Sequence, residues 1–227
     1  ERAVSRLASR KIATREVPVL FEAPLAAGLV GAFVQAVSGG ALYRKASFLD
    51  GCLGQAVLAE HLDLNEDPHQ IKGKGSAMFD DEGVATRPRK VVEAGRVLGY
   101  FLSSYSARKL GMRTTGHAGG AHNLALTSRL TQPRDDLEAM LRRLDRGLFV
   151  TELMGQGVNG VTGDYSRGAA GFWVERGRIV HPVHEVTIAG NLRDMLRGIV
   201  AVGADAYTSG SKTTGSVLIE RMKLAGA

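Results

Sequence analysis

The chain has 227 residues, of which 44% are apolar, 23% charged and 6% aromatic, and its formal net charge is +6. This composition excludes fibrous and disordered classes and is typical of an ordinary soluble globular protein. A chain of this length buries roughly 70% of its unfolded surface, so it can build a core without disulfide or metal cross-links.

The cysteine content and the lack of long apolar segments exclude further classes of protein. Cys52 is the only cysteine, which excludes an internal disulfide and a multi-thiolate zinc site. No apolar run reaches the roughly 20 residues of a membrane span, and residues 1–16 are charged throughout, unlike a signal peptide. We therefore expect a cytoplasmic protein with no membrane partner.

The positive charge is spread along the chain rather than concentrated. One basic group lies within residues 2–15, and a second within residues 72–90 is interrupted by Asp80, Asp81 and Glu82. Neither group has aromatic residues interleaved at a spacing that would stack bases. The sequence therefore permits an acidic partner, but nucleic-acid binding is not expected.

In the first third of the chain we predict two helices, one strand and one long loop. Residues 1–13 place apolar side chains at helical spacing between arginines, and their abrupt beginning suggests that the chain is part of a longer protein. Residues 17–21 form an apolar strand. Residues 24–37 form a buried helix whose small side chains allow close packing, with Pro24 in its first turn. Residues 61–78 are polar and rich in turn formers, which predicts a loop.

Two segments share a hairpin pattern. Residues 91–98 and 173–180 each place apolar, mostly β-branched residues on both sides of a Glu-x-Gly-Arg turn, where glycine supplies a positive φ. Amphipathic helices are predicted at 135–146 and 190–199. Because the strands cluster instead of alternating with helices, the pattern favours an α+β fold of two antiparallel sheets with packed helices.

Three short motifs match catalytic or binding signatures in their residue types but lack the further features that those signatures require. Residues 155–160 (GQGVNG) match the dinucleotide fingerprint, but no helix follows them to receive a pyrophosphate. Ser106 and Lys109 resemble a serine–lysine pair that lacks the further motifs of that chemistry. His117 and His122 bracket a flexible segment without a third metal ligand, which favours hydrogen-bonding roles in a loop.

Longer motifs resemble one protein family, the TldD/PmbA family, in its PmbA (TldE) branch. They are long, follow the family's order and span nearly the whole chain, which is identified as the C-terminal portion (residues 1–227), with no counterpart of the family's N-terminal domain. The motifs are residues 105–112 (YSARKLGM), 115–120 (TGHAGG), 150–158 (VTELMGQGV), 163–174 (GDYSRGAAGFWV), 185–192 (EVTIAGNL) and 215–218 (GSVL).

The resemblance implies a role in zinc-dependent proteolysis. The family is known for a TldD–TldE heterodimer that degrades or processes unfolded and flexible peptides, and it was earlier described as a modulator of DNA gyrase. Its catalytic branch carries His-Glu-x-x-x-His on the helix that ends in the motif matched here by residues 28–33 (GLVGAF). The three positions of that motif fall on Glu22, Ala23 and Ala27, and the third zinc ligand, a Cys, falls within residues 209–211.

These replacements predict a chain without a metal site. Alanine neither binds zinc nor takes a proton from a zinc-bound water. The hypothesis is therefore a non-catalytic subunit, inactive without a TldD-like partner that holds the zinc, and forming a dimer with that partner or with a second copy of itself. Its expected substrate-binding residues, for an unfolded peptide, are His117, Gly119, Gly120, His122, Asn159, Asp164 and Arg167. The alternative is a DNA- or gyrase-associated binding protein, suggested by the high pI and by the family's older description.

Overall fold

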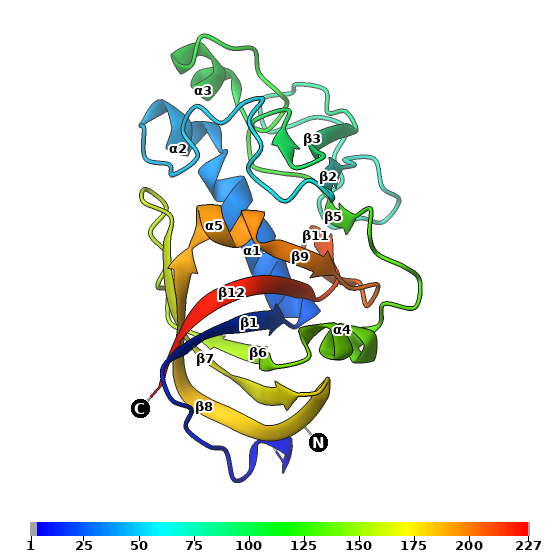
Figure 1. Ribbon diagram of the computed structural model, residues 1–227. Coiled ribbons are helices and arrows are strands. Elements are labelled where there is room, and N and C mark those ends of the chain that lie inside the picture. Colours follow the sequence, from blue (N-terminus) through cyan, green and yellow to red (C-terminus); the bar gives the residue numbers. More distant parts are fainter. Residues whose placement is uncertain (1–3, 227) are drawn as a thin grey trace.

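The structure is a computed structural model that describes residues 4–226, except for the side chain of residue 5. It consists of two six-stranded sheets with helix α1 running between them (Figure 1). The elements in chain order are a 3₁₀ turn η1 (Val4–Arg6), β1 (Arg15–Phe21), α1 (Ala23–Ala36), α2 (Gly39–Tyr43), β2 (Leu62–Glu66), β3 (Arg89–Glu93), β4 (Arg96–Val97), α3 (Ser104–Lys109), β5 (Leu124–Ser128), α4 (Leu137–Leu144), β6 (Gly147–Met154), β7 (Asp164–Glu175), β8 (Arg178–Asn191), α5 (Leu192–Arg197), β9 (Ile199–Val202), β10 (Tyr207–Ser209), β11 (Lys212–Thr214) and β12 (Val217–Ala225).

The first sheet closes on itself. Its strand order is β1-β6-β7-β8-β12-β9, and β1 also pairs with β12, so that five strands form a ring with β9 attached to β12. Every pairing is antiparallel except β1 with β6. Closure pairs the main-chain N–H and C=O groups of β1 on both of its edges, with β6 and with β12. The ring therefore leaves no free edge at β1 to which another chain could add.

The second sheet is open, with the order β10-β11-β5-β2-β3-β4. Each sheet contains one of the two predicted hairpins, β3–β4 in the second and β7–β8 in the first. Both hairpin turns have positive φ at their two central residues, Ala94 and Gly95 in one and Arg176 and Gly177 in the other, as a tight two-residue turn requires. The predicted α+β class with two mainly antiparallel sheets is thus confirmed.

Strands β1, β6 and β12 are buried on both faces. In β1, Val19 and Phe21 point to the main core against α1, whereas Leu20 points to a smaller core under α4. The same alternation holds in β6 and in β12, because neighbouring side chains of a strand point to opposite faces. This double burial explains why residues 17–21 of β1 form an uninterrupted apolar run.

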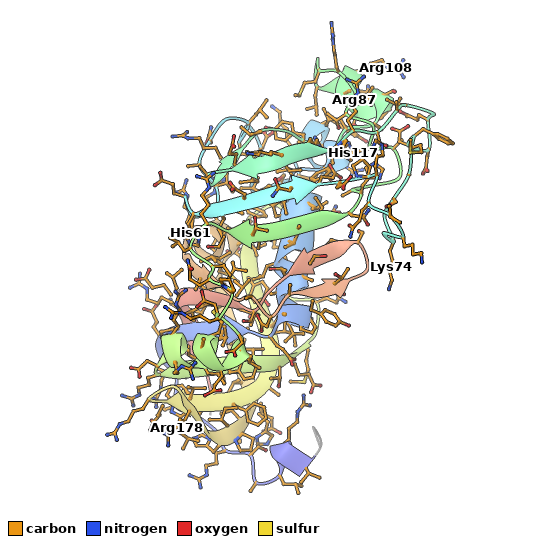
Figure 2. The ribbon with its side chains drawn as sticks, turned by 90° about the vertical axis from the view of Figure 1, so that its right-hand side faces the viewer. His61, Lys74, Arg87, Arg108, His117 and Arg178 are labelled. Carbon is orange, nitrogen blue, oxygen red and sulfur yellow. The ribbon has the colours of Figure 1, made fainter. Side chains whose placement is uncertain are left out.

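Helix α1 follows β1 after one residue and packs against both sheets. Pro24 lies in its first turn, where its missing N–H costs no helical hydrogen bond. The β10–β11 hairpin of the second sheet lies over α1, which also contacts β6 of the first sheet (Figure 2). The predicted helices 24–37, 135–146 and 190–199 correspond to α1, α4 and α5 and are confirmed, with shorter ends for the last two.

The predicted helix at residues 1–13 is wrong over its described part, while residues 1–3 lie outside the described residues. Only the 3₁₀ turn Val4–Arg6 forms, and Arg10 instead makes a bridge to Val183 of β8. Val4 and Leu7 are 67% and 69% exposed. An apolar stripe stabilises a short helix only where a surface covers it. Here Val4 and Leu7 face solvent, and of the apolar residues expected on the stripe only Ile12 is buried.

The predicted loop at 61–78 is also partly wrong, because β2 occupies Leu62–Glu66 in the centre of the second sheet. Leu62, Leu64 and Glu66 are buried, while the residues between them are not. The alternation is a strand pattern, but the charged Asp63 and Glu66 within it make the segment read as polar. Within residues 4–226, no helix is both long enough and apolar enough to cross a membrane.

A backbone contact inside the ring of strands yields the first prediction. A Cβ added at Gly171 of β7 would lie 1.9 Å from the carbonyl oxygen of Phe149 in β6. Because the obstacle is main chain, Gly171→Ala should lower the free energy of unfolding by about 1–3 kcal/mol or more. Gly160→Ala is the control, since nothing lies within 4 Å of its added Cβ. Denaturant unfolding of both variants measures the difference, and equal stability would contradict this account of the β6–β7 pair.

Candidate functional site

A cleft of about 350 Å³ opens over the N-terminal half of α1. Its floor is the helix, one wall comes from β6 and β7 of the first sheet, and the other wall comes from the β10–β11 hairpin of the second. The residues that line it are Pro24, Leu25, Ala27, Gly28, Gly31, Leu153, Arg167, Ser209 and Lys212. The cleft therefore lies where the two sheets meet.

Arg167 reaches the cleft from β7. It stands two residues after Tyr165, so both side chains leave the same face of the strand, toward the core. Tyr165 is 4% exposed, and burial raises its pKa to about 12 against the opposing effect of the Arg167 guanidinium. Nε of Arg167 is buried and has no hydrogen-bond partner among the described residues.

Lys212 reaches the cleft from the opposite wall. Its Cε lies 3.7 Å from the position that a Cβ on Gly31 would occupy, so its side chain crosses the helix above that glycine. Neither Lys212 nor Arg167 forms an ion pair with another residue of the described range 4–226. The cleft thus holds two cations without a carboxylate partner. Sequence reasoning identified Arg167 but missed Lys212, which is brought to α1 only by the fold of its hairpin.

Two positions of the implied metal site, Ala27 and Ser209, lie on this cleft. Glu22 is the N-cap of α1, Ala23 is its first residue, and Ala27 and Ser209 line the cleft although they are far apart in the sequence. The lining residues supply no imidazole, thiolate or carboxylate, so their chemistry does not fit zinc. Across the described part of the chain, no group of three or more His, Cys, Asp or Glu residues could hold a metal ion.

The loop between β6 and β7 uses its polar side chains on itself. Oδ1 of Asn159 accepts hydrogen bonds from the backbone N–H of Val161 and of Thr162, and Oδ2 of Asp164 accepts one from the Thr162 hydroxyl at 2.6 Å. The backbone N–H of Asn159 donates to the carbonyl of Asp164. These contacts shape the loop, and neither side chain lines the cleft that holds Arg167.

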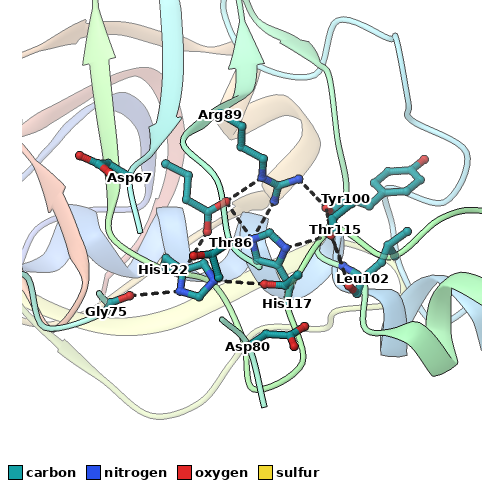
Figure 3. A network of polar contacts seen from close by, with 12 residues as sticks. Asp67, Gly75, Asp80, Thr86, Arg89, Tyr100, Leu102, Thr115, His117 and His122 are labelled. Atoms are coloured by element: carbon teal, nitrogen blue, oxygen red, sulfur yellow. Dashed lines mark hydrogen bonds and ion pairs between the residues drawn. The ribbon is translucent and has the colours of Figure 1, made fainter. Parts of the chain in front are cut away.

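His117 and His122 belong to a buried network beside the second sheet (Figure 3). Nε2 of His117 donates to Oε2 of Glu66 at 2.9 Å, and Nδ1 lies 2.9 Å from the Thr115 hydroxyl. The ring nitrogens of His122 lie 3.1 Å from the carbonyl oxygens of Gly75 and Gly116. Both histidines are less than 9% exposed, so their ring nitrogens are occupied within the fold.

Glu66 is the centre of this network. Burial raises the pKa of its carboxyl, but the hydrogen bond from His117 and the Arg89 guanidinium outweigh burial and lower the pKa to about 2. Nε of Arg89 donates to Oε2 at 2.7 Å, and Oε1 accepts the backbone N–H of His122. A fully paired buried carboxylate of this kind orients the loop that carries both histidines.

Gly119 and Gly120 lie in the same loop with φ of +98° and +122°, which glycine adopts without strain. A Cβ on Gly119 would meet the carboxylate of Asp81 at 2.4 Å. The seven residues expected to bind substrate therefore occupy three places: the histidine loop, the β6–β7 loop and the cleft. The structure does not bring them into one pocket.

The network gives a prediction for acid stability. Glu66 titrates near 2 in the folded protein instead of at its usual 4.5, so it contributes about 3 kcal/mol above pH 4.5 that is lost as the pH falls toward 2. Glu66→Gln should be less stable at pH 7 and should lose less stability on acidification. Denaturant unfolding from pH 7 to pH 3 tests this, with Glu138→Gln, at an exposed helical ion pair, as control. Parallel acid profiles for wild type and Glu66→Gln would contradict it.

The floor of the cleft gives a third prediction. Nothing lies within 4 Å of a Cβ added at Gly28, and alanine favours a helix interior by about 1 kcal/mol over glycine. Gly28→Ala should therefore raise the free energy of unfolding by roughly that amount. Gly39→Ala is the opposite control, because its Cβ would lie 2.2 Å from the Ser106 hydroxyl. A destabilised Gly28→Ala protein would mean that the floor of the cleft is packed more tightly than described.

Named relatives in the bacteria match nearly the whole chain. The chain is 51% identical over 225 residues to a protein of Escherichia coli O157:H7 named metalloprotease PmbA, and 50% identical over 226 residues to a Haemophilus influenzae protein named metalloprotease PmbA homolog. These matches cover 99% and 100% of this chain but 49% of each relative. The chain thus spans about half the length of the curated relatives it matches.

Solved structures share the fold. A Bacteroides thetaiotaomicron protein described as a proposed modulator of DNA gyrase superposes with a TM-score of 0.92 at 29% identity, covering all of this chain and 50% of that one. TldE from Thermococcus kodakarensis superposes with a TM-score of 0.83 at 25% identity, covering 98% and 53%. Residues 14–226 match the family described as the PmbA/TldA metallopeptidase C-terminal domain. The chain therefore belongs to the PmbA/TldD family.

Proposed function

We propose that this chain is part of the non-catalytic subunit of a TldD–TldE-type metalloprotease complex, which degrades or processes flexible peptides. The zinc in this proposal is held by a TldD-like partner subunit. The observation that carries the proposal is the cleft over α1, where Ala27 and Ser209 stand at positions that the family resemblance assigns to zinc ligands. Their side chains support binding by shape and charge and offer no base or metal ligand.

The edge of the second sheet supports the peptide-binding part of the proposal. Strand β10 pairs with β11 on one side only, and all three of its residues are exposed. Its last residue, Ser209, lines the cleft. An extended peptide can add to such an edge through main-chain hydrogen bonds, which do not depend on the peptide's side chains. This mode of binding suits a complex that accepts many unfolded sequences.

Association with DNA or gyrase is the second hypothesis. Two solved structures that the chain resembles, from Bacteroides thetaiotaomicron and Thermotoga maritima, are described as proposed modulators of DNA gyrase. In this chain, however, several cations on or beside the second sheet are already paired: Arg89 with Glu66, Lys90 with Glu93 and Arg129 with Asp63. These pairs leave fewer cations for phosphates, and the peptide-binding role therefore ranks first.

The test uses the full-length protein that contains this chain, alone and mixed with a subunit that carries His-Glu-x-x-x-His. We expect the two to co-sediment as a complex that cleaves an unfolded protein and is inhibited by EDTA. The protein alone should show no such cleavage, because its cleft lacks zinc-ligating side chains. A matched control replaces the first His of the partner's motif, which should abolish cleavage and leave assembly intact.

Two results would overturn the proposal. One is EDTA-sensitive cleavage by the protein alone, together with stoichiometric zinc in metal analysis. The other is a protein that stays monomeric with every candidate partner. In the second case, an electrophoretic shift with DNA that weakens steeply with salt would favour the DNA hypothesis, since counterion release makes phosphate contacts strongly dependent on salt.

A further inference from the structure

We infer that the cleft over α1 binds the C-terminal carboxylate of a peptide. The inference rests on the proposed function and narrows its substrate class, from flexible peptides in general to peptides held by their free C-terminal end. It starts from the two cations of the cleft, Arg167 and Lys212, and from the space between them.

The positive charge of the cleft is not balanced by a negative side chain. Arg167 and Lys212 come from opposite walls, no acidic residue lines the cleft, and neither cation has an ion-pair partner within the described residues. The polar neighbour of the Arg167 guanidinium is the Tyr165 hydroxyl, whose pKa of about 12 leaves it uncharged at neutral pH, so the charge of Arg167 is not balanced there. A carboxylate would accept from the guanidinium with one oxygen and from the ammonium with the other, and charge-assisted hydrogen bonds of this kind are among the strongest in proteins.

The helix that forms the floor keeps this space open. Gly28 has nothing within 4 Å of an added Cβ, and at Gly31 the first neighbour is the flexible end of Lys212 at 3.7 Å. Glycine weakens a helix interior, and no packing contact in the structure requires it at position 28. Leu25 and Leu153 add an apolar surface. The cleft thus has room for one terminal residue, with its side chain on the leucines and its carboxylate between the cations.

The geometry of the sheet edge favours a chain end over an acidic side chain. Strand β10 ends at Ser209, where the lining of the cleft begins, and both β10 and β11 pack against α1. The hairpin turns after Ser209, which pairs with Lys212, so a peptide that pairs in parallel with β10 has no further strand residue to pair with beyond this point. Its last residue would lie in the cleft, with its main-chain carboxylate in place of the next peptide group.

The experiment compares two forms of one peptide on the full-length protein. A short neutral peptide carries a fluorescent label at its N-terminus and ends in either a free acid or an amide, and binding is followed by fluorescence anisotropy. We expect the free acid to bind roughly ten- to a hundredfold more tightly, as charge-assisted hydrogen bonds imply. A third peptide, amidated but with Asp as its last residue, tests an acidic side chain as the source of the carboxylate.

Two variants assign the preference to the cleft. Lys212→Met and Arg167→Met keep much of the side-chain bulk and remove the charge, so each should reduce the acid-over-amide ratio about tenfold. The control is Arg178→Met, which removes one exposed positive charge at the turn end of the β7–β8 hairpin (Figure 2). Arg178 pairs with Glu175, which lies eight residues after Arg167 in β7, so the two arginines are roughly 25 Å apart along the strand. The control should leave the ratio unchanged. If Arg167→Met unfolds, Lys212→Met on the surface hairpin carries the test.

The outcomes separate this inference from the proposed function. Equal binding of acid and amide, or a ratio that Lys212→Met leaves unchanged, overturns the inference. Tight binding of the amidated Asp peptide overturns the assignment to the chain terminus. Co-sedimentation with the zinc-bearing subunit is measured on the same variants, so a protein that assembles but shows no carboxylate preference refutes the cleft alone.

Discussion

The burial of β1 on both faces is the constraint on which the rest of the structure depends. Phe21 and Leu20 are fully buried in opposite directions, one against α1 and the other under α4. The strand is also held on both edges, in parallel by β6 and antiparallel by β12. Because α1 begins after one further residue, the closed sheet fixes the place of the helix N-terminus. The ring of strands therefore determines where the floor of the cleft begins.

The cleft itself depends on both sheets. Arg167 comes from the ring of the first sheet, and Ser209 and Lys212 come from the edge hairpin of the second, so neither sheet alone forms the two walls. Helix α1 packs against both, and one contiguous core contains residues from each of them. Loss of the packing around α1 would separate the two cations before it disturbed the buried network around Glu66, whose partners lie in the second sheet and in the loop of His117 and His122.

Local patterns in the sequence predicted local structure well. The two Glu-x-Gly-Arg hairpins and the stripe of α4 depend on neighbouring residues, and they form as expected. Long-range features could not be predicted in this way. The closure of β1 onto β12 joins residues about 200 positions apart, and Lys212 reaches α1 only through its hairpin. The helix expected at 1–13 was wrong for the same reason, since periodicity does not show whether another surface covers the stripe. The family resemblance, in contrast, pointed to Ala27 and to residues 209–211, and Ala27 and Ser209 line one cleft although they are far apart in the sequence.

The charges of the cleft bear on the proposed role, because they stand where the family resemblance implies a zinc site in the catalytic branch. A zinc ion carries two positive charges, and the cleft of this chain has two cationic side chains, Arg167 and Lys212. Both donate hydrogen bonds to an anion, but neither offers an open coordination position that would activate a water. A cleft of this kind can hold a peptide end without hydrolysing it. In a paired complex, such an anchor would hold the peptide while the zinc-bearing subunit cuts it, and selectivity would lie in the chain end instead of in the side chains along the β10 edge.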